Sequence, residues 1–561
     1  MGSRRKVDVS TQEWRWVAFW GGVFVTITFL PYALAMFASN DTWHFLGMLG
    51  NPKDGAPYFA KIRQGIQGNW LYDFRYTPET HDSAGLFTFY LLLGHLARLL
   101  GFSNFVIFHL ARIAASLFML TAFYQFGATV WQRLRPRRMF FAITTVASGL
   151  GWLVLPLVPD NGVFPPDIGI PEAFPLYASF VNPHFPFIIG CLTLMAATLL
   201  SVFRPGFSEA PTVDNGGLQL ILLSVLISIV QPPAMIGIGA ALVVFIFLSS
   251  YINHSIPWHE VRWGAMVWLP AFPVAIYYIL VFQTSSIVEE FNKQNITPSP
   301  NIFFTLMSFG ILLFIAFPGI ARAVRRFERD GDQLMLLWLI ANLIAIYTPY
   351  SLQRRFFIGL IIPFSFFAVR AVEDYWSYHI APRWQRVTMV VALILIFPSH
   401  FITLGIPLYG AISDREAGAN AGLVAGADYI AVYDWLEEVG QVDEVVLAAP
   451  NISLWIPSRT DLRVVYGHPF ETVPADTRLK QVEDFYSGRD CTALFNENLK
   501  FQIDYVVWGS EERQFAKDIQ EDNPNQSHSD CIAQMVTDQE LTDDQIRIFG
   551  DVTLYTLREL R

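Results

Sequence analysis

Long apolar segments recur along the first 410 residues, separated by short polar loops. A helix needs about 20 mostly apolar residues to cross the hydrocarbon core of a bilayer. Eleven segments approach that length: 16–38, 105–130, 140–158, 185–203, 218–230, 234–252, 264–282, 301–320, 333–349, 356–372 and 387–408. Gln231, Pro232 and Pro233 interrupt the fifth and sixth, which could instead be one long broken helix. The pattern predicts a polytopic α-helical membrane protein with about 11 transmembrane helices.

A twelfth apolar segment, residues 84–100, differs from the others because it is short and carries His95 and Arg98. We expect it to be a juxtamembrane helix that lies on the outer face. Residues 39–104 then form one large first outer loop that contains its own helices.

Basic residues set the expected orientation, because loops rich in Lys and Arg stay on the cytoplasmic side. Clusters occur at residues 4–6, 133–138 and 322–329, with a weaker pair at Arg383 and Arg386. With eleven crossings, all four fall on one side only if residues 84–100 do not cross. We therefore predict a multi-pass protein of the cell membrane with a cytoplasmic N-terminus and an extracytoplasmic C-terminal domain.

The C-terminal part of the chain has a different pattern. Residues 428–439 have helical periodicity, whereas residues 443–450, 462–469, 504–510 and 552–557 read as short strands. This alternation predicts a soluble α/β domain. We place the boundary so that residues 1–409 form the transmembrane domain and residues 410–561 form an accessory domain.

Composition and charge agree with this division. The 561 residues are 53% hydrophobic and 15% charged. Residues 410–561 hold 28 acidic and 12 basic side chains, whereas the preceding 409 residues hold 20 acidic and 26 basic ones. An acidic outer domain argues against nucleic acid as a partner, since phosphate binding relies on clustered Lys and Arg.

Within the first outer loop, the stretch NPKDGAPYFAKIRQGIQGNW, residues 51–70, predicts an amphipathic helix. Tyr58, Ile62 and Ile66 repeat at helical spacing, and Asp54 comes just before the expected first turn. On spacing alone, Asp54 reads as an N-terminal cap.

The pattern D-x-x-x-Y-x-A-x-I-R-x-x-x-x-G-x-W, from Asp54 to Trp70, resembles the first outer loop of GT-C superfamily glycosyltransferases, in particular bacterial family 39-like members. The resemblance implies transfer of a sugar from a polyprenyl-phosphate carrier in the membrane to an acceptor on the extracytoplasmic face. It also implies that Asp54 is the general base, with Asp41 as the rival, and that Tyr58 and Arg63 contact the substrate. The acceptor, whether glycan, lipid or protein, is not specified.

Cations at the outer surface are expected to hold the lipid phosphate. Arg354 and Arg355 stand between two predicted spans, and arginine binds phosphate oxygens with a planar fork. The alternative is that both are interfacial anchors. His184 begins a span and could orient a phosphate or carboxylate, although a structural histidine is the alternative.

Three acidic residues in the second outer loop could bind a divalent metal, Mg or Mn, as in some GT-C enzymes; they are Asp160, Asp167 and Glu172. Solvated surface is the simpler interpretation. No other cofactor is expected. In the C-terminal domain, His468 and Glu471 of the segment GHPFET are candidate contact residues.

Cys491 and Cys531 could pair if the C-terminal domain faces an oxidising space, but we favour two free thiols. Two other functions remain open for the whole chain. One is a non-catalytic membrane receptor or assembly protein, and the other is a lipid-linked oligosaccharide transferase or polysaccharide ligase.

Overall fold

The computed structural model describes residues 9–159, 162–203, 215–496, 499–522 and 528–558. The N-terminal basic cluster at residues 4–6 and Asp160 lie outside the described residues. The chain divides into two compact units. The first contains residues 1–31, 109–279 and 296–406, and the second contains residues 32–108, 280–295 and 407–561. The expected boundary at residue 410 stays a proposal.

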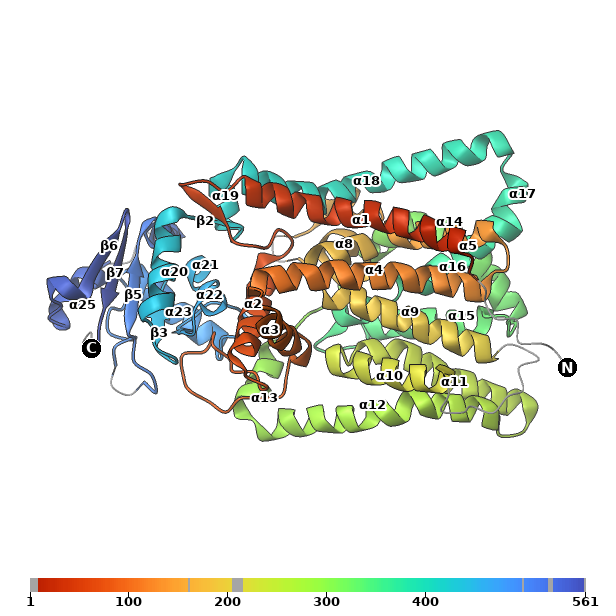
Figure 1. The fold of residues 1–561 in the computed structure, drawn as a ribbon, viewed down its shortest axis with the longest axis horizontal. Coiled ribbons are helices and arrows are strands. Elements are labelled where there is room, and N and C mark those ends of the chain that lie inside the picture. The colour runs from red at the N-terminus through yellow and green to blue at the C-terminus, as the bar shows by residue number, and fades with distance from the viewer. Residues whose placement is uncertain (1–8, 160–161, 204–214, 497–498, 523–527, 559–561) are drawn as a thin grey trace. The chain divides into compact units, whose positions relative to one another are not determined.

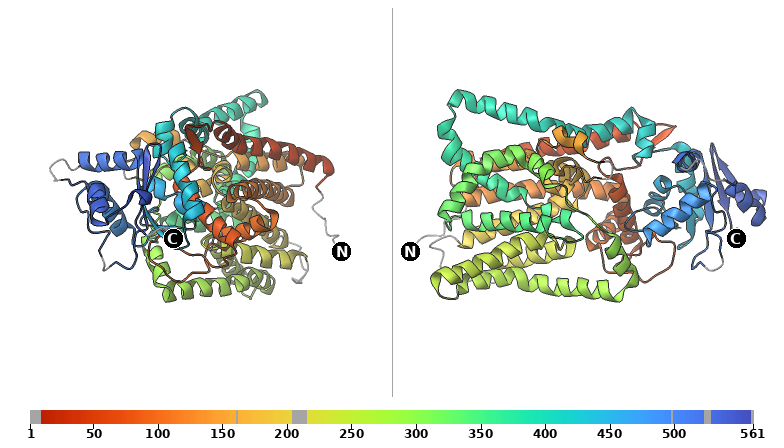
Figure 2. Two further views of the ribbon diagram at one scale, coloured as in Figure 1. Left: turned by 60° about the vertical axis from the view of Figure 1, so that its left-hand side comes forward. Right: turned by 180° about the vertical axis from the view of Figure 1, so that it is seen from behind.

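The first unit is built from apolar helices, which run roughly side by side in Figure 1 and in the right-hand view of Figure 2. Among the described residues, nine helical segments are long and apolar enough to cross a membrane. They are Thr11–Phe37 (α1), Asn104–Val130 (α4), Leu134–Leu157, His184–Phe203 (α9), Ala234–Asn253 (α11), Trp258–Thr284 (α12), Ile302–Arg326 (α14), Gln353–His379 and Pro382–Ile412 (α18). The chain is a multi-pass membrane protein, as predicted.

The remaining two predicted spans are shorter helices, α10 (Asn215–Val230) and α15 (Asp332–Tyr347). The residues Gln231, Pro232 and Pro233 separate α10 from α11, so the chain is interrupted where both the two-span interpretation and the alternative of one long broken helix place the interruption. Proline has no N–H to donate, and its ring clashes with the preceding turn.

Two of the long segments contain breaks. Leu134–Leu157 consists of α5 (Leu134–Val146), α6 (Gly151–Val154) and η1 (Leu155–Leu157). Gln353–His379 consists of η3 (Gln353–Phe357), α16 (Ile361–Ala371), η4 (Val372–Trp376) and α17 (Ser377–His379). The second outer loop forms three short turns, which are α7 (Pro166–Gly169), η2 (Pro171–Ala173) and α8 (Pro175–Val181).

Asn342 of α15 holds the loop that carries Arg354 and Arg355. Its Nδ2 donates hydrogen bonds to the carbonyl oxygens of Phe356, at 2.7 Å, and Ile358, at 3.3 Å. Gly237 of α11 makes room for this amide, because a Cβ at that position would lie 1.7 Å from Asn342 Oδ1. A buried amide inside the bundle thus positions residues 353–358.

In the second unit, the first outer loop forms α2 (Pro52–Gln67) and α3 (Thr88–Leu100). Ile62 is buried, and Tyr58 and Ile66 pack against the same apolar core, as the helical spacing predicted. With 13 residues, α3 is too short to cross a bilayer, which agrees with the predicted juxtamembrane helix. Its buried side carries Tyr90, Leu91, Gly94 and Ala97.

The two helices cross at a pair of glycines. A Cβ on Gly94 would lie 2.2 Å from the carbonyl oxygen of Ile62, and a Cβ on Gly65 would lie 2.3 Å from that of Leu91. Backbone meets backbone there, so the contact requires glycine on both helices.

Replacing Gly94 by alanine should therefore push α3 away from α2 and destabilise the protein by about 1–3 kcal/mol. The melting temperature of the purified protein in detergent measures this effect. Gly22→Ala in α1 is the matched control, because no atom lies within 4 Å of its added Cβ. Equal melting temperatures for the two variants would contradict the glycine crossing.

The C-terminal residues form a five-stranded sheet of order β4-β3-β5-β7-β6. Its strands are β3 (Val445–Leu447), β4 (Arg463–Val464), β5 (Tyr505–Trp508), β6 (Ile546–Phe549) and β7 (Val552–Thr556). The pairs β3–β4 and β3–β5 are parallel, and β5–β7 and β6–β7 are antiparallel. All four predicted strands are present, and the predicted helix is α20 (Ala427–Val439). The predicted α/β fold is confirmed.

A second sheet, which the sequence pattern did not indicate, joins distant parts of this unit. Trp43–Phe45 (β1) pairs antiparallel with Val424–Gly426 (β2). The other helices of the unit are α13 (Ser286–Gln294), α19 (Arg415–Asn420), α21 (Pro450–Ser453), α22 (Ile456–Arg459), α23 (Ala475–Tyr486), α24 (Ser510–Asp522), α25 (Cys531–Asp538) and η5 (Asp543–Gln545).

Cys491 and Cys531 form a disulfide that closes a loop of 40 residues, with their Cα atoms 4.9 Å apart. The expectation of two free thiols is therefore wrong. Cys531 begins α25 and belongs to the apolar core on which α23 and α24 also pack, and this shared core brings the two cysteines together.

Candidate functional site

The candidate site in the second unit begins at the N-terminus of α2. Asn51, with a φ of 52°, is the N-cap residue, and Asp54 lies inside the first helical turn. The interpretation of Asp54 as the cap is therefore wrong. Asn51 Nδ2 instead donates a hydrogen bond of 2.5 Å to Asp54 Oδ2. The carboxylate is held at the positive end of the helix dipole, which favours its ionised form.

The segment GHPFET lies beside this carboxylate. His468 Nε2 is 3.8 Å from Asp54 Oδ1; the histidine side chain is buried, whereas that of Asp54 is 40% exposed. The structure thus brings together two predicted site residues that are more than 400 positions apart in the sequence. A half-exposed carboxylate can accept a proton from a bound hydroxyl group.

Lys61, which the sequence pattern did not indicate, lies seven residues after Asp54, about two turns further along α2. Its side chain is fully buried and forms an ion pair with Glu471 Oε1. Tyr72 donates its hydroxyl hydrogen to Glu471 Oε2. Three aromatic rings surround the ammonium group, with centroids at 5.0 Å (Tyr58), 4.9 Å (Tyr72) and 4.1 Å (Phe87).

Burial lowers the pKa of Lys61, while Glu471 and the more distant Asp54 favour its charged form. Burial and the adjacent Glu471 also raise the pKa of the Tyr72 hydroxyl. The cluster consequently places a buried Lys61–Glu471 ion pair on the helix that carries Asp54, out of contact with solvent. A lysine in an otherwise apolar helix face, seven residues after Asp54, was the available sequence signal.

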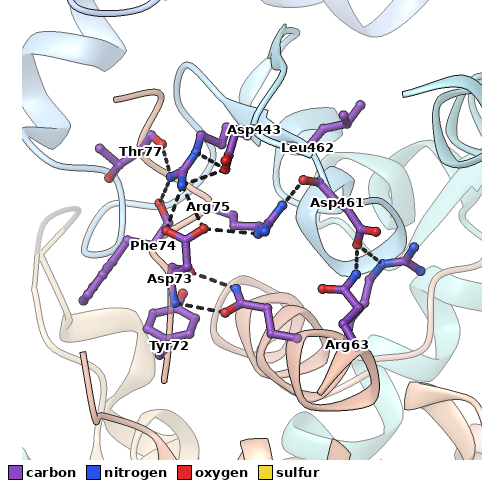
Figure 3. Close-up of polar contacts among 12 residues, drawn as sticks. Arg63, Tyr72, Asp73, Phe74, Arg75, Thr77, Asp443, Asp461 and Leu462 are labelled. Carbon is purple, nitrogen blue, oxygen red and sulfur yellow. Dashed lines mark hydrogen bonds and ion pairs between the residues drawn. The ribbon is translucent and has the colours of Figure 1, made fainter. Parts of the chain in front are cut away.

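Arg63 of α2 makes two ion pairs within the unit, and Figure 3 shows the one with Asp461. Its Nε is 2.8 Å from Asp461 Oδ1, and its Nη1 is 2.9 Å from Glu437 Oε1. Tyr58 instead stacks on Tyr90, with centroids 4.2 Å apart. Substrate contacts by Tyr58 and Arg63 stay predictions.

Asp41, the predicted rival of Asp54, lines a separate cavity of about 270 Å³. The other polar or aromatic lining residues are Thr42, Trp43, Asp428, Tyr429, Ser510 and Glu511. None of the residues that surround Asp54 lines this cavity. The structure therefore assigns different surroundings to the two candidate bases.

In the first unit, Arg354 and Arg355 belong to η3. Arg355 Nη1 is 3.2 Å from Glu172 Oε1, and this carboxylate is buried. The backbone N–H of Arg354 donates to the carbonyl oxygen of Thr297 at 3.1 Å. The backbone N–H of Arg355 likewise donates to the carbonyl oxygen of Leu352 at 3.1 Å, so backbone hydrogen bonds fix the main chain of both arginines.

The residues predicted to bind a metal serve other partners. Asp167 accepts hydrogen bonds from Ser308 Oγ at 2.6 Å, Ser399 Oγ at 2.7 Å and the N–H of Gly151 at 3.0 Å. Glu172 faces Arg355. His184 is buried at the start of α9 with its ring against Phe185. Because protein donors occupy Asp167 and an arginine faces Glu172, these two carboxylates fit a divalent cation poorly.

A different acidic cluster, Glu328, Asp330 and Asp332, has ligand atoms within 4.8 Å of one another. Arginines neutralise it: Arg322 Nη1 is 2.7 Å from Asp332 Oδ2, and Arg370 Nη2 is 2.9 Å from Asp330 Oδ2. A metal therefore stays a sequence prediction, and the function proposed below includes no metal step.

No protein-family model and no curated protein matches this sequence. Solved structures do match the fold. The oligosaccharyltransferase of Archaeoglobus fulgidus, tethered with an acceptor peptide containing the NVT sequon, has a TM-score of 0.52 and 13% identity, and the match covers 88% of this chain and 69% of that one. The same organism's AglB, in complex with an inhibitory peptide and a dolichol-phosphate, has a TM-score of 0.51 and 14% identity, with 89% and 70% covered.

ArnT from Cupriavidus metallidurans in the apo state matches over nearly the full length of both chains, with 98% of this chain and 99% of that one covered. The TM-score is 0.51 and the identity 12%. At such identities a structural likeness establishes the fold and leaves the activity to be argued from the site. The bundle of apolar helices, the helical first outer loop with Asp54 and the C-terminal α/β fold together show that this chain has the GT-C fold of membrane glycosyltransferases.

Proposed function

We propose that this protein is a membrane glycosyltransferase that moves a sugar from a polyprenyl-phosphate carrier to an acceptor on the extracytoplasmic face. The observation that carries the proposal is the Asp54 carboxylate, which is half-exposed, accepts a hydrogen bond from Asn51, lies 3.8 Å from His468 Nε2 and shares α2 with the buried Lys61. The dolichol-phosphate in the AglB structure supports a lipid phosphate as the type of carrier.

In the proposed reaction, Asp54 takes the proton from the acceptor hydroxyl group as the acceptor oxygen attacks the anomeric carbon. The bond between that carbon and the phosphate oxygen breaks, and its electron pair leaves with the lipid phosphate. The base and the leaving group act on opposite sides of the sugar, so the configuration at the anomeric carbon is inverted.

The second proposed element is a phosphate site at Arg354 and Arg355. A guanidinium group can donate two parallel hydrogen bonds to phosphate oxygens and offsets the charge that develops on the leaving group. In this proposal Glu172 holds Arg355, whose Nη1 lies 3.2 Å from Glu172 Oε1.

Arg354→Gln should weaken binding of the lipid donor by about 10- to 100-fold, since a hydrogen bond to a charged group contributes about 1.5–3 kcal/mol. The KM for a polyprenyl-phosphate sugar in detergent micelles measures the loss. Arg354→Lys should fall between the wild type and Arg354→Gln, because it keeps the charge and loses the fork. Arg386→Gln, on an exposed residue of α18, is the control. An unchanged KM for Arg354→Gln would remove this arginine from the phosphate site.

Transfer assays with purified protein in proteoliposomes test the function itself. Radiolabelled sugars on polyprenyl phosphate and oligosaccharides on polyprenyl pyrophosphate are supplied with glycan, lipid and peptide acceptors. Transfer from the first donor class supports the proposal, whereas transfer from the second alone would favour an oligosaccharide transferase. Absence of transfer from both would favour the receptor or assembly protein.

The proposed orientation places the N-terminus in the cytoplasm and the C-terminal domain outside the cell membrane. Arg133 between α4 and α5, Arg135 in the first turn of α5 and Arg322 near the end of α14 would then be cytoplasmic. This arrangement would put Asp54 in the compartment where the acceptor is glycosylated.

A further inference from the structure

His468 presents a hydrogen-bond donor to the proposed catalytic base. Its Nδ1 accepts hydrogen bonds from the backbone N–H groups of Phe470 and Glu471, both at 3.1 Å. A nitrogen that accepts hydrogen bonds carries no hydrogen, so the neutral ring carries its proton on Nε2. That is the nitrogen 3.8 Å from Asp54 Oδ1.

The backbone that fixes this ring is itself held tightly. Thr472 Oγ1 accepts from the N–H groups of Gly467 and His468, both at 3.2 Å. Thr77 Oγ1 donates to the carbonyl oxygen of Glu471 at 3.0 Å and accepts from the N–H of Val473 at 3.0 Å. The segment 467–473 therefore has little freedom to turn the imidazole away from Asp54.

The Lys61–Glu471 ion pair joins this segment to the helix that bears the base. Lys61 and Asp54 both belong to α2, and Glu471 and His468 both belong to GHPFET. Two contacts, one buried and one at the solvent boundary, thus connect the same two pieces of chain. The buried pair sets the distance at which His468 meets Asp54.

We propose that His468 is a positioning residue for Asp54 and that the Lys61–Glu471 pair fixes its position. This inference rests on the function proposed above. Asn51 donates a hydrogen bond to Oδ2, and His468 Nε2 lies 3.8 Å from Oδ1, so each carboxylate oxygen faces one of these two side chains. A carboxylate that is held in one orientation is already placed to accept the proton of the acceptor hydroxyl group. Misplacement of this carboxylate by about 1 Å can lower the rate about 100-fold.

His468→Ala and His468→Gln separate positioning from substrate contact. We expect His468→Ala to lower kcat by about 10- to 100-fold with the donor KM unchanged. We expect His468→Gln to recover most of the rate, because its amide nitrogen can replace Nε2 as the donor. His528→Ala is the matched control, since His528 lies in the same unit and its Nδ1 is 2.7 Å from the carbonyl oxygen of Ser487, away from GHPFET. Melting temperatures of all variants verify folding.

A raised KM with unchanged kcat for His468→Ala would overturn positioning in favour of substrate contact. A folded His468→Gln that is as slow as His468→Ala would overturn the role of the donor hydrogen. Hydrogen–deuterium exchange at residues 52–60 gives a readout that needs no activity. Faster exchange in His468→Ala supports the positioning contact even if the wild type transfers no sugar, and unchanged exchange contradicts it.

Discussion

Asp54→Asn should reduce sugar transfer by about 100- to 10,000-fold, the range that a general base contributes. Asparagine has nearly the same shape and can keep its neighbours in place, but it cannot take the proton of the acceptor hydroxyl group. The loss should appear in kcat, because the lipid donor is still bound through its phosphate. Initial rates with a polyprenyl-phosphate sugar at saturating donor measure the effect.

Asp41→Asn is the matched control for this prediction. Asp41 is exposed and lines a separate cavity with Asp428 and Glu511, so its variant should keep near wild-type activity. If Asp41→Asn lost activity and Asp54→Asn kept it, the two roles would have to be exchanged. If both variants kept full activity, a general base at either position would be wrong.

Arg463→Leu should destabilise the protein by about 3–5 kcal/mol, because it leaves a buried carboxylate without its main partner. Arg463 Nη2 lies 2.8 Å from both oxygens of Asp73, and its Nε donates to Asp443 Oδ1 at 2.9 Å. The guanidinium side chain is only 3% exposed. Figure 3 shows Asp73 and Asp443 around this group.

The same network explains why the effect should reach α2. The backbone carbonyl oxygen and N–H of Asp73 exchange two hydrogen bonds with the side chain of Gln64 of α2, at 2.8 and 2.9 Å, so the residue whose carboxylate Arg463 holds also anchors the helix that bears Asp54. Arg75, 3.4 Å from Asp73, compensates for part of the lost charge. The expected result is a lower melting temperature together with lower transferase activity.

Arg513→Leu is the control for Arg463→Leu, because Arg513 pairs with the exposed Asp551. Loss of this surface ion pair should lower the free energy of unfolding by less than about 1 kcal/mol. In the double variant Arg463→Leu with Asp73→Asn, the buried charge is removed and part of the stability should return. Equal melting temperatures for Arg463→Leu and Arg513→Leu would show that the buried ion pair contributes little.

Local patterns in the sequence were sufficient to predict much of this fold. Span length predicted the apolar helices, and β-branched runs predicted β3, β4, β5 and β7. Periodicity predicted α2 with Ile62 on its buried side. Each of these features depends on neighbours within one element, which a single sequence displays directly.

Features that depend on distant parts of the chain were missed. The strands β1 and β2 are three residues long, too short for alternation, and they exist because they pair with each other. Helical spacing predicts Asp54 as the cap, because the spacing does not show that Asn51 ahead of it adopts the left-handed conformation and is the N-cap residue. The sequence around Lys61 does not indicate its ion pair, because its partner, Glu471, is 410 residues away. The disulfide depends in the same way on the packing of α25.

A structure with polyprenyl phosphate bound would test the central claim most directly, since both the base and the phosphate site are assigned. The account predicts phosphate oxygens within about 3 Å of the guanidinium group of Arg354 or Arg355, with Asp54 as the carboxylate nearest to the position of the anomeric carbon, which the sugar-loaded donor carries on its phosphate oxygen. A phosphate bound away from both arginines, or next to Asp41 in place of Asp54, would contradict it.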